Sequence, residues 1–218
     1  MSYNTVIFDM DGLLINSEPI WNEAAFEVFS LLGKSCNRKE FSLTTGLRTR
    51  EFVQWWFNHF KLNPSQIPKA ESDIVALVEK NILTKNIVLP GVPYILKFFM
   101  DRKFKIGLAS SSPMSLINLV VDALGIRHNF ECICSASELK YGKPHPQVYL
   151  NCAELMQSEP TSCIAFEDSF NGMLAAKSAR MKCIVVPDSS QFTHKVWGSS
   201  DLKISSLNNF NELLLYSL

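Results

Sequence analysis

The sequence predicts an α/β fold, in which a parallel sheet is covered on both faces by helices. Short apolar runs rich in β-branched residues recur along the chain, as the buried strands of parallel sheets do. Segments with helical spacing of apolar residues lie between most of these runs, and this alternation is typical of α/β proteins. One long stretch near the amino terminus lacks the strand pattern, which predicts that a helical module is inserted into the fold.

The predicted strands are five short apolar runs bounded by polar or turn-forming residues. The first begins within a few residues of Met1, and the other four follow the long helical stretch. They are Thr5–Phe8, Lys105–Ala109, Glu131–Ser135, Cys163–Phe166 and Cys183–Pro187. Because a helical segment separates most neighbouring runs, we expect the strands to pair in parallel.

Helices are expected between the later strands, where apolar residues recur every three or four positions. Pro90 and Gly91 form a break before the first of these helices, and Gly125 follows the second, as helix start and stop signals do. The four predicted segments are Val92–Arg102, Met114–Leu124, Pro146–Met156 and Gly172–Ala179.

The stretch 16–85 is interpreted as an inserted helical domain, so the catalytic core is predicted to comprise 1–15 together with 86–218. The helical segments of the insertion are Ile20–Leu32, Thr49–Phe60 and Ile74–Leu83. Because the insertion follows the first strand directly, it should stand over the carboxyl end of that strand, where open α/β sheets bind their ligands. We expect it to act as a lid.

The composition argues against nucleic acid and membrane as partners. With 21 basic and 21 acidic residues among 218, the net charge is zero, and the chain lacks the positive field that nonspecific nucleic-acid binding needs. No apolar run approaches the roughly 20 residues that span a bilayer, and the first strand begins too early for a secretory signal. We expect a soluble cytoplasmic protein, either a monomer or a weak homodimer.

The cysteines and histidines show no spacing typical of a zinc site. Cys132 and Cys134 have the spacing of one strand face, and we expect the cysteines to pack as small apolar side chains. The positions concerned are Cys36, Cys132, Cys134, Cys152, Cys163 and Cys183, with His59, His128, His145 and His194.

Two carboxylates at the end of the first predicted strand are the strongest local sign of chemistry. Asp9 and Asp11 are two positions apart, and Gly12 after them permits a sharp turn. A carboxylate there can attack phosphorus to form an acyl phosphate, while its neighbour gives a proton to the leaving oxygen. The motif alone is also that of a polar turn after a strand, so the other motifs decide between the two interpretations.

Two further segments supply groups that can bind phosphate. Ser110 and Ser111 lie with a third hydroxyl at a strand end just before a helix, where backbone N–H groups bind anions. Ordinary helix capping by serine is the alternative. Lys143 lies in a loop that Pro144 and Pro146 stiffen ahead of another helix, and the alternative is a solvated surface lysine.

Two adjacent acids at the end of the fourth predicted strand can hold a metal ion. An anionic nucleophile facing an anionic phosphate needs a cation to offset their repulsion, and Mg²⁺ suits oxygen ligands. Glu167 and Asp168 would complete a magnesium shell with Asp9 and the backbone carbonyl of Asp11. Helix capping by Asp168 is the alternative.

The order of these four motifs resembles the haloacid dehalogenase superfamily of phosphotransferases, and the resemblance covers essentially the whole chain. It implies a Rossmann-like parallel sheet with a small helical cap, an Mg²⁺ cofactor and a small phosphorylated metabolite as substrate. The implied roles are nucleophile for Asp9, general acid/base for Asp11, phosphate binding for Ser110, Ser111 and Lys143, and metal binding for Asp168, with Glu167 in or next to the metal shell.

Within that superfamily, the chain is similar to bacterial hexitol phosphatases, also called 2-deoxyglucose-6-phosphate phosphatases. The similarity lies in segments 9–15, 17–19, 46–48, 143–150 and 171–173. It implies hexitol and hexose phosphates as substrates. Asn16 departs from the pattern, because many relatives carry aspartate there. In the predicted cap, Glu18 and Arg48 are candidates for substrate specificity, whereas Trp55 and Trp56 are better explained as cap core.

The resemblance leaves alternatives within and outside the phosphatases. Dehalogenases lack the second aspartate, so Asp11 argues against them. Sugar phosphomutases of the β-phosphoglucomutase type carry a cap histidine about ten residues after that aspartate, where this chain has Trp21. A phosphonatase would need a reactive cap lysine, and none is identified. A catalytically inactive binding protein on the same scaffold is disfavoured because every expected catalytic residue type is present.

Overall fold

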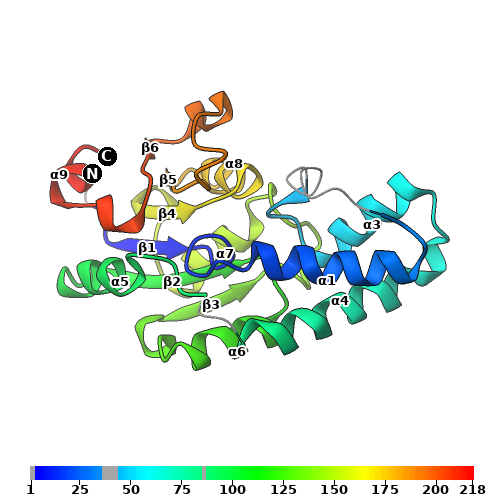
Figure 1. Ribbon diagram of the computed structural model, residues 1–218. Coiled ribbons are helices and arrows are strands. Elements are labelled where there is room, and N and C mark those ends of the chain that lie inside the picture. The colour runs from blue at the N-terminus through cyan, green and yellow to red at the C-terminus, as the bar shows by residue number, and fades with distance from the viewer. Residues whose placement is uncertain (1–2, 36–43, 85–86) are drawn as a thin grey trace.

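A computed structural model of the chain describes residues 3–35, 44–84 and 87–218. Its centre is a six-stranded sheet with the order β3-β2-β1-β4-β5-β6, and all five strand pairs are parallel. The predicted α/β fold is therefore confirmed. In Figure 1 the strands run in a common direction, with their carboxyl ends toward the side where α1 and α3 lie.

The strands agree with the sequence prediction to within two residues at each end, except that one strand was not predicted. They are β1 (Thr5–Phe8), β2 (Lys105–Ser110), β3 (Cys132–Ser135), β4 (Cys163–Glu167), β5 (Lys182–Val185) and β6 (Leu202–Lys203). The strand β6 is two residues long and carries no periodicity that a sequence pattern could reveal. Both β1 and β4 are buried throughout, which explains their continuous apolar character.

The predicted helices are present, and the largest difference in their bounds concerns α4. The α-helices are α1 (Glu18–Leu31), α3 (Thr49–Phe60), α4 (Ile67–Ile82), α5 (Val92–Asp101), α6 (Met114–Ala123), α7 (Gln147–Leu155), α8 (Phe170–Ser178) and α9 (Glu212–Tyr216). The prediction that the third inserted helix begins at Ile74 was wrong by about two turns. Pro68 stands in its first turn, where a missing N–H costs nothing.

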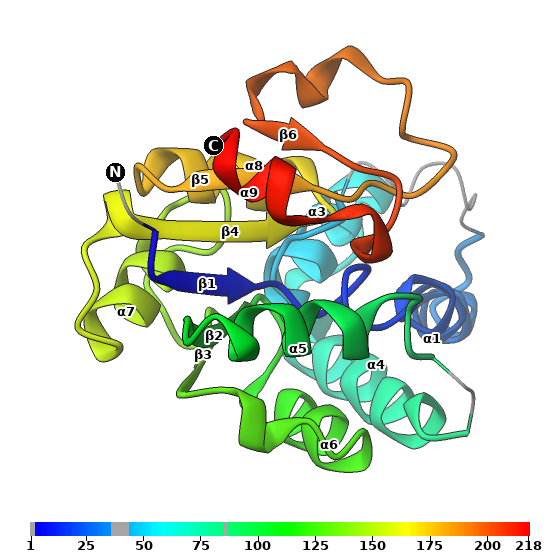
Figure 2. The same ribbon diagram turned by 90° about the vertical axis from the view of Figure 1, so that its left-hand side faces the viewer.

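The helices cover the two faces of the sheet in pairs (Figure 2). Val6 and Phe8 of β1 point into one core cluster with apolar residues of α5 and α6, whereas Ile7 points into a second cluster with residues of α7 and α8. This alternation follows from the period of two along a strand. It buries β1 on both faces and fixes the place where the chain leaves the sheet at Asp9.

Helices α1, α3 and α4 lie together beyond the carboxyl ends of the strands (Figure 1). Phe29 of α1 and Trp56 of α3 meet inside this layer with ring centroids 6.2 Å apart, and both are buried. Trp55 is 37% exposed, so only one of the two tryptophans belongs to the interior of this layer. The boundaries 16 and 85 of the inserted domain stay a prediction.

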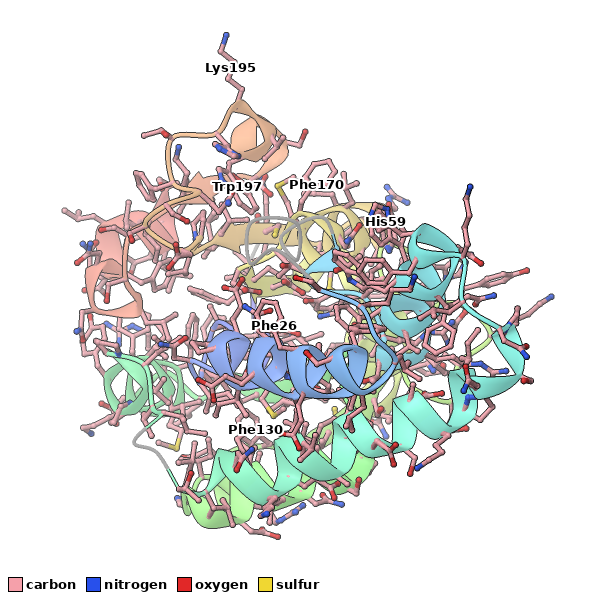
Figure 3. All side chains as sticks on the ribbon, turned by 45° about the vertical axis from the view of Figure 1, so that its right-hand side comes forward. Phe26, His59, Phe130, Phe170, Lys195 and Trp197 are labelled. Atoms are coloured by element: carbon pink, nitrogen blue, oxygen red, sulfur yellow. The ribbon has the colours of Figure 1, made fainter. Side chains whose placement is uncertain are left out.

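The carboxyl-terminal part closes the β6 side of the sheet. In the 3₁₀ segment Lys195–Ser199, Trp197 points inward and donates a hydrogen bond from Nε1 to the Gln191 carbonyl at 2.8 Å, whereas Lys195 projects outward (Figure 3). Across the residues that the structure describes, no helix is both long and apolar enough to cross a membrane.

Candidate active site

The sheet order brings the four predicted motifs to one place. Strand β1 lies between β2 and β4, so the residues that follow β1 are flanked by the ends of both neighbours. Asp9 follows β1, Ser110 ends β2, and Glu167 ends β4. Parallel strands end at the same edge, which is where open α/β sheets bind ligands.

Asp9 is held inside the protein by a buried ammonium group. The Lys143 Nζ atom lies 2.6 Å from Asp9 Oδ1 and 2.6 Å from Glu167 Oε1, and it also donates to the Ala109 carbonyl at 3.0 Å. Asp9 is 5% exposed and Lys143 is 2% exposed. Lys143 is therefore a buried group that bridges two carboxylates, and the surface-lysine alternative is wrong.

Glu167 is fully engaged by hydrogen bonds. Its Oε1 accepts from Lys143 and from the Tyr149 hydroxyl at 2.6 Å, while Oε2 accepts from the backbone N–H groups of Asp168 and Ser169 at 3.2 and 3.4 Å. Gly172, in the first turn of α8, makes room for this carboxylate, because an added Cβ would lie 1.9 Å from it. Glu167 thus fixes Lys143 and the start of the α8 loop.

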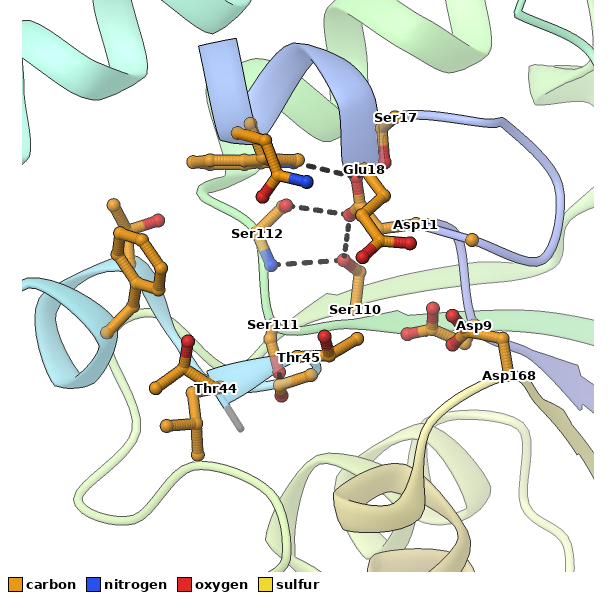
Figure 4. A pocket seen from close by; sticks show the side chains of 17 residues that line it. Asp9, Asp11, Ser17, Glu18, Thr44, Thr45, Ser110, Ser111, Ser112 and Asp168 are labelled. Carbon is orange, nitrogen blue, oxygen red and sulfur yellow. Dashed lines mark hydrogen bonds between the residues drawn. The ribbon is translucent and has the colours of Figure 1, made fainter. Parts of the chain in front are cut away.

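Asp11 is held by neutral donors from two sides (Figure 4). Its Oδ1 accepts from the Ser17 hydroxyl at 2.6 Å and from Trp21 Nε1 at 3.2 Å, both at the start of α1. Its Oδ2 accepts from the Ser112 hydroxyl at 2.8 Å, just after β2, and from the Ser110 hydroxyl at 3.3 Å, at the end of β2. Asp11 therefore joins the inserted helices to the sheet.

The three serines at the end of β2 and just after it have different partners. Ser110 is buried, and its hydroxyl accepts from the Ser112 N–H at 3.0 Å while donating to Asp11. The Ser111 hydroxyl donates to the Gly46 carbonyl at 2.9 Å. All three serines line the same cavity as Asp9 and Asp11 (Figure 4). The helix α6 begins two residues later, so its first N–H groups lie close behind.

The carboxylates at this edge suit a hard divalent cation. Asp9, Glu167 and Asp168 each offer an oxygen, and these atoms lie within 4.8 Å of one another. Burial raises the pKa of Asp9 to about 8 against the lowering effect of Lys143, and burial also raises the pKa of Asp168, with Asp9 and Glu167 adding to it. Burial is the main cause in both cases, and the excess of carboxylates over one ammonium group adds to it; an ion such as Mg²⁺ would balance this negative charge.

Gly12 has two reasons to be glycine. Its φ of +80° lies in the left-handed region that side chains rarely adopt. An added Cβ would also lie 1.9 Å from Asp168 Oδ2. The turn after Asp11 is therefore shaped so that the Asp168 carboxylate can lie directly against its backbone.

A cavity of about 110 Å³ lies between the sheet edge and the inserted helices. The inserted segment contributes polar side chains to its wall. They are Ser17, Glu18, Asn22, Thr44, Thr45 and Thr49, and they lie beside the apolar Trp21, Leu47 and Phe52. Glu18, predicted as a specificity residue, therefore lies at the cavity.

Arg48, the other predicted specificity residue, does not line that cavity. Its guanidinium pairs with Glu51 at 2.5 Å and donates to the backbone carbonyls of Ala136 and Leu139, beyond β3. Nearby, the Asn171 side chain donates to the Thr45 carbonyl at 3.0 Å. These contacts fasten the inserted segment to the loops of the sheet.

Sequence reasoning missed several residues that contact the predicted ones. The sequence motifs do not single out Ser17, Ser112 or Tyr149 as functional, and they indicate Trp21 only as the residue that stands where mutases carry histidine. Tyr149 lies on α7 six residues after Lys143, so its link to Glu167 appears only when α7 packs on the sheet. Ser112 was visible as a third hydroxyl beside Ser110.

Comparisons with known proteins agree with this architecture. A family model described as haloacid dehalogenase-like hydrolase matches residues 3–180. Hexitol phosphatase B of Escherichia coli strain K12 is 38% identical over 202 residues, which cover 92% of this chain and 91% of that protein. Among solved structures, CbbY from Rhodobacter sphaeroides in complex with phosphate has a TM-score of 0.88 at 24% identity, covering 99% and 100% of the two chains. A β-phosphoglucomutase from Clostridium difficile has a TM-score of 0.85 at 22% identity, covering 98% of this chain and 96% of that one.

Proposed function

Because this chain belongs to the haloacid dehalogenase-like hydrolase family and is a phosphoric monoester hydrolase, we propose that it hydrolyses hexitol and hexose phosphates through an aspartyl phosphate on Asp9. The observation that carries the mechanism is that Asp9 and Asp11 line the same cavity. The Asp9 carboxylate forms an ion pair with the Lys143 ammonium group, whereas the Asp11 carboxylate accepts hydrogen bonds from serine hydroxyls. The similarity to hexitol phosphatase B supports the substrate class.

In this mechanism Asp9 is the nucleophile. Lys143 occupies Oδ1, which leaves Oδ2 to form the bond to phosphorus as the bond to the leaving oxygen breaks. Ser110 and Ser111, which line the cavity, would bind the phosphate oxygens, and Lys143, which lies beside Asp9 Oδ1 but not in the cavity wall, would add its positive charge to phosphate binding. Glu167 accepts a hydrogen bond from the Lys143 ammonium group and so holds it in position.

Asp11 is the general acid and base. Protonated Asp11 would give its proton to the leaving sugar oxygen, and the resulting carboxylate would then take a proton from the water that attacks the acyl phosphate. Ser17 and Trp21 keep its carboxylate on the cavity side. Each turnover returns Asp11 to its starting protonation state.

The residues present fit Mg²⁺ as the cofactor. Asp9, Asp168 and the backbone carbonyl of Asp11 would hold the ion, and Glu167 would support them through the backbone of the α8 loop. When bound, the ion would offset the repulsion between the Asp9 carboxylate and the phosphate.

Trp21 favours a phosphatase over a phosphomutase. Its indole N–H is directed at Asp11 Oδ1, and an indole cannot exchange a proton with a sugar hydroxyl as an imidazole can. A mutase would need a second proton carrier to move phosphate between two positions of a sugar.

A substrate panel tests the proposal. We expect kcat/KM to be highest for sorbitol, mannitol and 2-deoxyglucose 6-phosphates, with lower values for nucleotides, and activity to need added Mg²⁺. Glucose 1-phosphate should release phosphate without forming glucose 6-phosphate. Preference for nucleotides would refute the substrate class, and formation of glucose 6-phosphate would support the mutase.

We also propose that Glu18 contributes to sugar recognition. It lies at the cavity near the start of α1, where a carboxylate can accept hydrogen bonds from sugar hydroxyls. Glu18→Ala should raise KM for hexitol phosphates and leave hydrolysis of p-nitrophenyl phosphate nearly unchanged. Glu27→Ala is the matched control, because Glu27 is exposed on the same helix away from the cavity. An equal effect of both substitutions would contradict this role.

A further inference from the structure

Three cysteines form a cluster away from the phosphatase site. Cys132 and Cys134 lie two residues apart on β3, so their side chains leave the same face of the sheet, and Cys152 of α7 packs against that face. The three Sγ atoms lie within 4.8 Å of one another, and those of Cys132 and Cys152 are 3.2 Å apart. Cys134 and Cys152 are buried, and Cys132 is partly exposed.

A fourth sulfur atom borders the same space. Gly107 pairs with Cys132 across the β2–β3 register, and its missing side chain leaves room there. An added Cβ at Gly107 would lie 2.6 Å from Cys152 Sγ and 3.1 Å from Met156 Sδ. The thiol of Cys152 and the thioether of Met156 therefore face the same position on β2.

We propose that Cys132, Cys134 and Cys152 form a binding site for a soft monovalent metal cation, for which Cu(I) is the probe. Thiolate and thioether ligands select soft cations over Mg²⁺ or Ca²⁺. The cluster offers three thiols, whereas structural zinc sites use four ligands in a tetrahedron. Three metal–sulfur bonds of about 2.3 Å in a plane would separate the sulfurs by about 4.0 Å, so the side chains need to move by less than about 1 Å.

Binding is coupled to the release of thiol protons, because the thiolate is the ligand. Each ligating cysteine exchanges its S–H proton for a metal–sulfur bond, and the proton passes to solvent. The partly exposed Cys132, on the edge strand of the sheet, gives the cation a way in.

The cluster is independent of the proposed phosphatase chemistry. Cys132 begins β3, at the opposite end of the strand from the edge where Asp9 and Ser110 lie. Metal binding can therefore be measured without reference to activity. Failure of one proposal leaves the other untouched.

The experiment is a competition for Cu(I) between the reduced full-length protein and a chromogenic chelator, without oxygen. Cys36, which lies outside the described residues, is replaced by serine in every form so that its thiol does not compete. We expect one Cu(I) per chain, and Cys132→Ala should weaken binding by more than the roughly 10–100-fold that loss of an outer-shell partner costs. Cys163→Ala is the matched control, because it removes a buried thiol elsewhere.

X-ray absorption of the loaded protein provides a measurement that needs no variant. We expect a shell of three sulfur atoms with no nitrogen or oxygen. Unchanged affinity in Cys132→Ala, a mixed shell, four-coordinate zinc bound more tightly than Cu(I), or a Cys132–Cys152 disulfide in place of a bound ion would each overturn the proposal.

Discussion

The two aspartates of the site lie two residues apart, yet their surroundings differ in kind. Asp9 is buried against the ammonium group of Lys143, which lies in the loop before α7 and also holds Glu167. Asp11 is partly exposed and lies among hydroxyls and an indole, two of which come from α1. One carboxylate is held by charge inside the core, and the other by neutral donors at the boundary of the inserted helices.

This difference matches two chemical tasks. A nucleophile must be ionised and fixed: the Lys143 ammonium fixes Asp9 and favours its charged form, and a bound cation would offset the larger raising effect of burial on its pKa. A general acid must gain and lose a proton in each turnover, and neutral hydroxyls can turn to serve either state because each both donates and accepts. Substitutions of the two aspartates and of their partners test this contrast, and loss of the nucleophile should have the largest effect.

Asp9→Asn should abolish turnover. The amide keeps the shape of the side chain but cannot form the acyl phosphate, and loss of a covalent nucleophile costs on the order of 10⁶-fold in a well-studied protease. Phosphate release from p-nitrophenyl phosphate measures this. Robust activity in Asp9→Asn would refute the assignment of the nucleophile.

Asp11→Asn should slow the enzyme by about 10²–10⁴-fold on alkyl phosphates, which is the usual size of acid–base catalysis. The loss should be smaller on p-nitrophenyl phosphate, because its leaving group needs little protonation. Steady-state kcat on the two substrates gives the comparison. Equal losses on both would mean that Asp11 positions groups without moving a proton.

Lys143→Met should lower the free energy of unfolding by about 3–5 kcal/mol, because two buried carboxylates lose their shared partner. Urea unfolding at about pH 9 with a metal chelator measures the loss. Because Lys143 lowers the pKa of Asp9, its loss should raise that pKa further above about 8, so the deficit should be largest well above pH 8 and should shrink as the pH falls toward about 8, where Asp9 is protonated in both folded proteins.

Lys182→Met is the matched control for that experiment. Lys182 pairs with Asp201 at 3.0 Å near the surface, where Lys177 is a second partner at 2.6 Å. Loss of such a pair costs about 1 kcal/mol or less. If the two lysine variants lost equal stability, burial of the Asp9 ion pair would have no special consequence.

Trp21→Phe should reduce kcat/KM by about fivefold, as expected for one hydrogen bond of about 1 kcal/mol. In this variant Asp11 keeps its hydrogen bonds from Ser17, Ser110 and Ser112, and the phenyl ring preserves most of the apolar cavity wall that Trp21 forms. Steady-state kcat/KM on alkyl phosphates measures the loss. Trp55→Phe, on the exposed part of α3, should leave kcat/KM unchanged.

The sequence predicted the parts of the molecule that depend on local pattern. Five strands and the residues at their carboxyl ends were predicted because buried parallel strands are continuous apolar runs with polar residues after them. Asp9, Asp11, Ser110, Lys143 and Asp168 were all found at one edge, as the motif order implied. Their catalytic roles stay predictions.

What the sequence did not predict depends on contacts between distant segments. Tyr149 and Glu167 are 18 residues apart and meet only through packing of α7, and Ser17 was hidden because a serine before a helix suggests a cap. Arg48 was predicted to contribute to substrate specificity, but its guanidinium reaches the loop beyond β3 and does not line the cavity. Side-chain direction across a domain boundary cannot be predicted from spacing.

The hydrogen bonds to the Thr45 and Gly46 carbonyls have a consequence for how a ligand enters the cavity. Ser111 and Asn171 hold the backbone carbonyls of these residues at 2.9 and 3.0 Å without any substrate present. An added Cβ at Gly46 would lie 2.5 Å from Ser169 Oγ, so the two surfaces are in close contact. The inserted segment is thus fastened to the loops of the sheet before any ligand binds. We expect the breaking of these two hydrogen bonds to limit the rate of ligand entry, and this limit should be the same for every phosphorylated ligand.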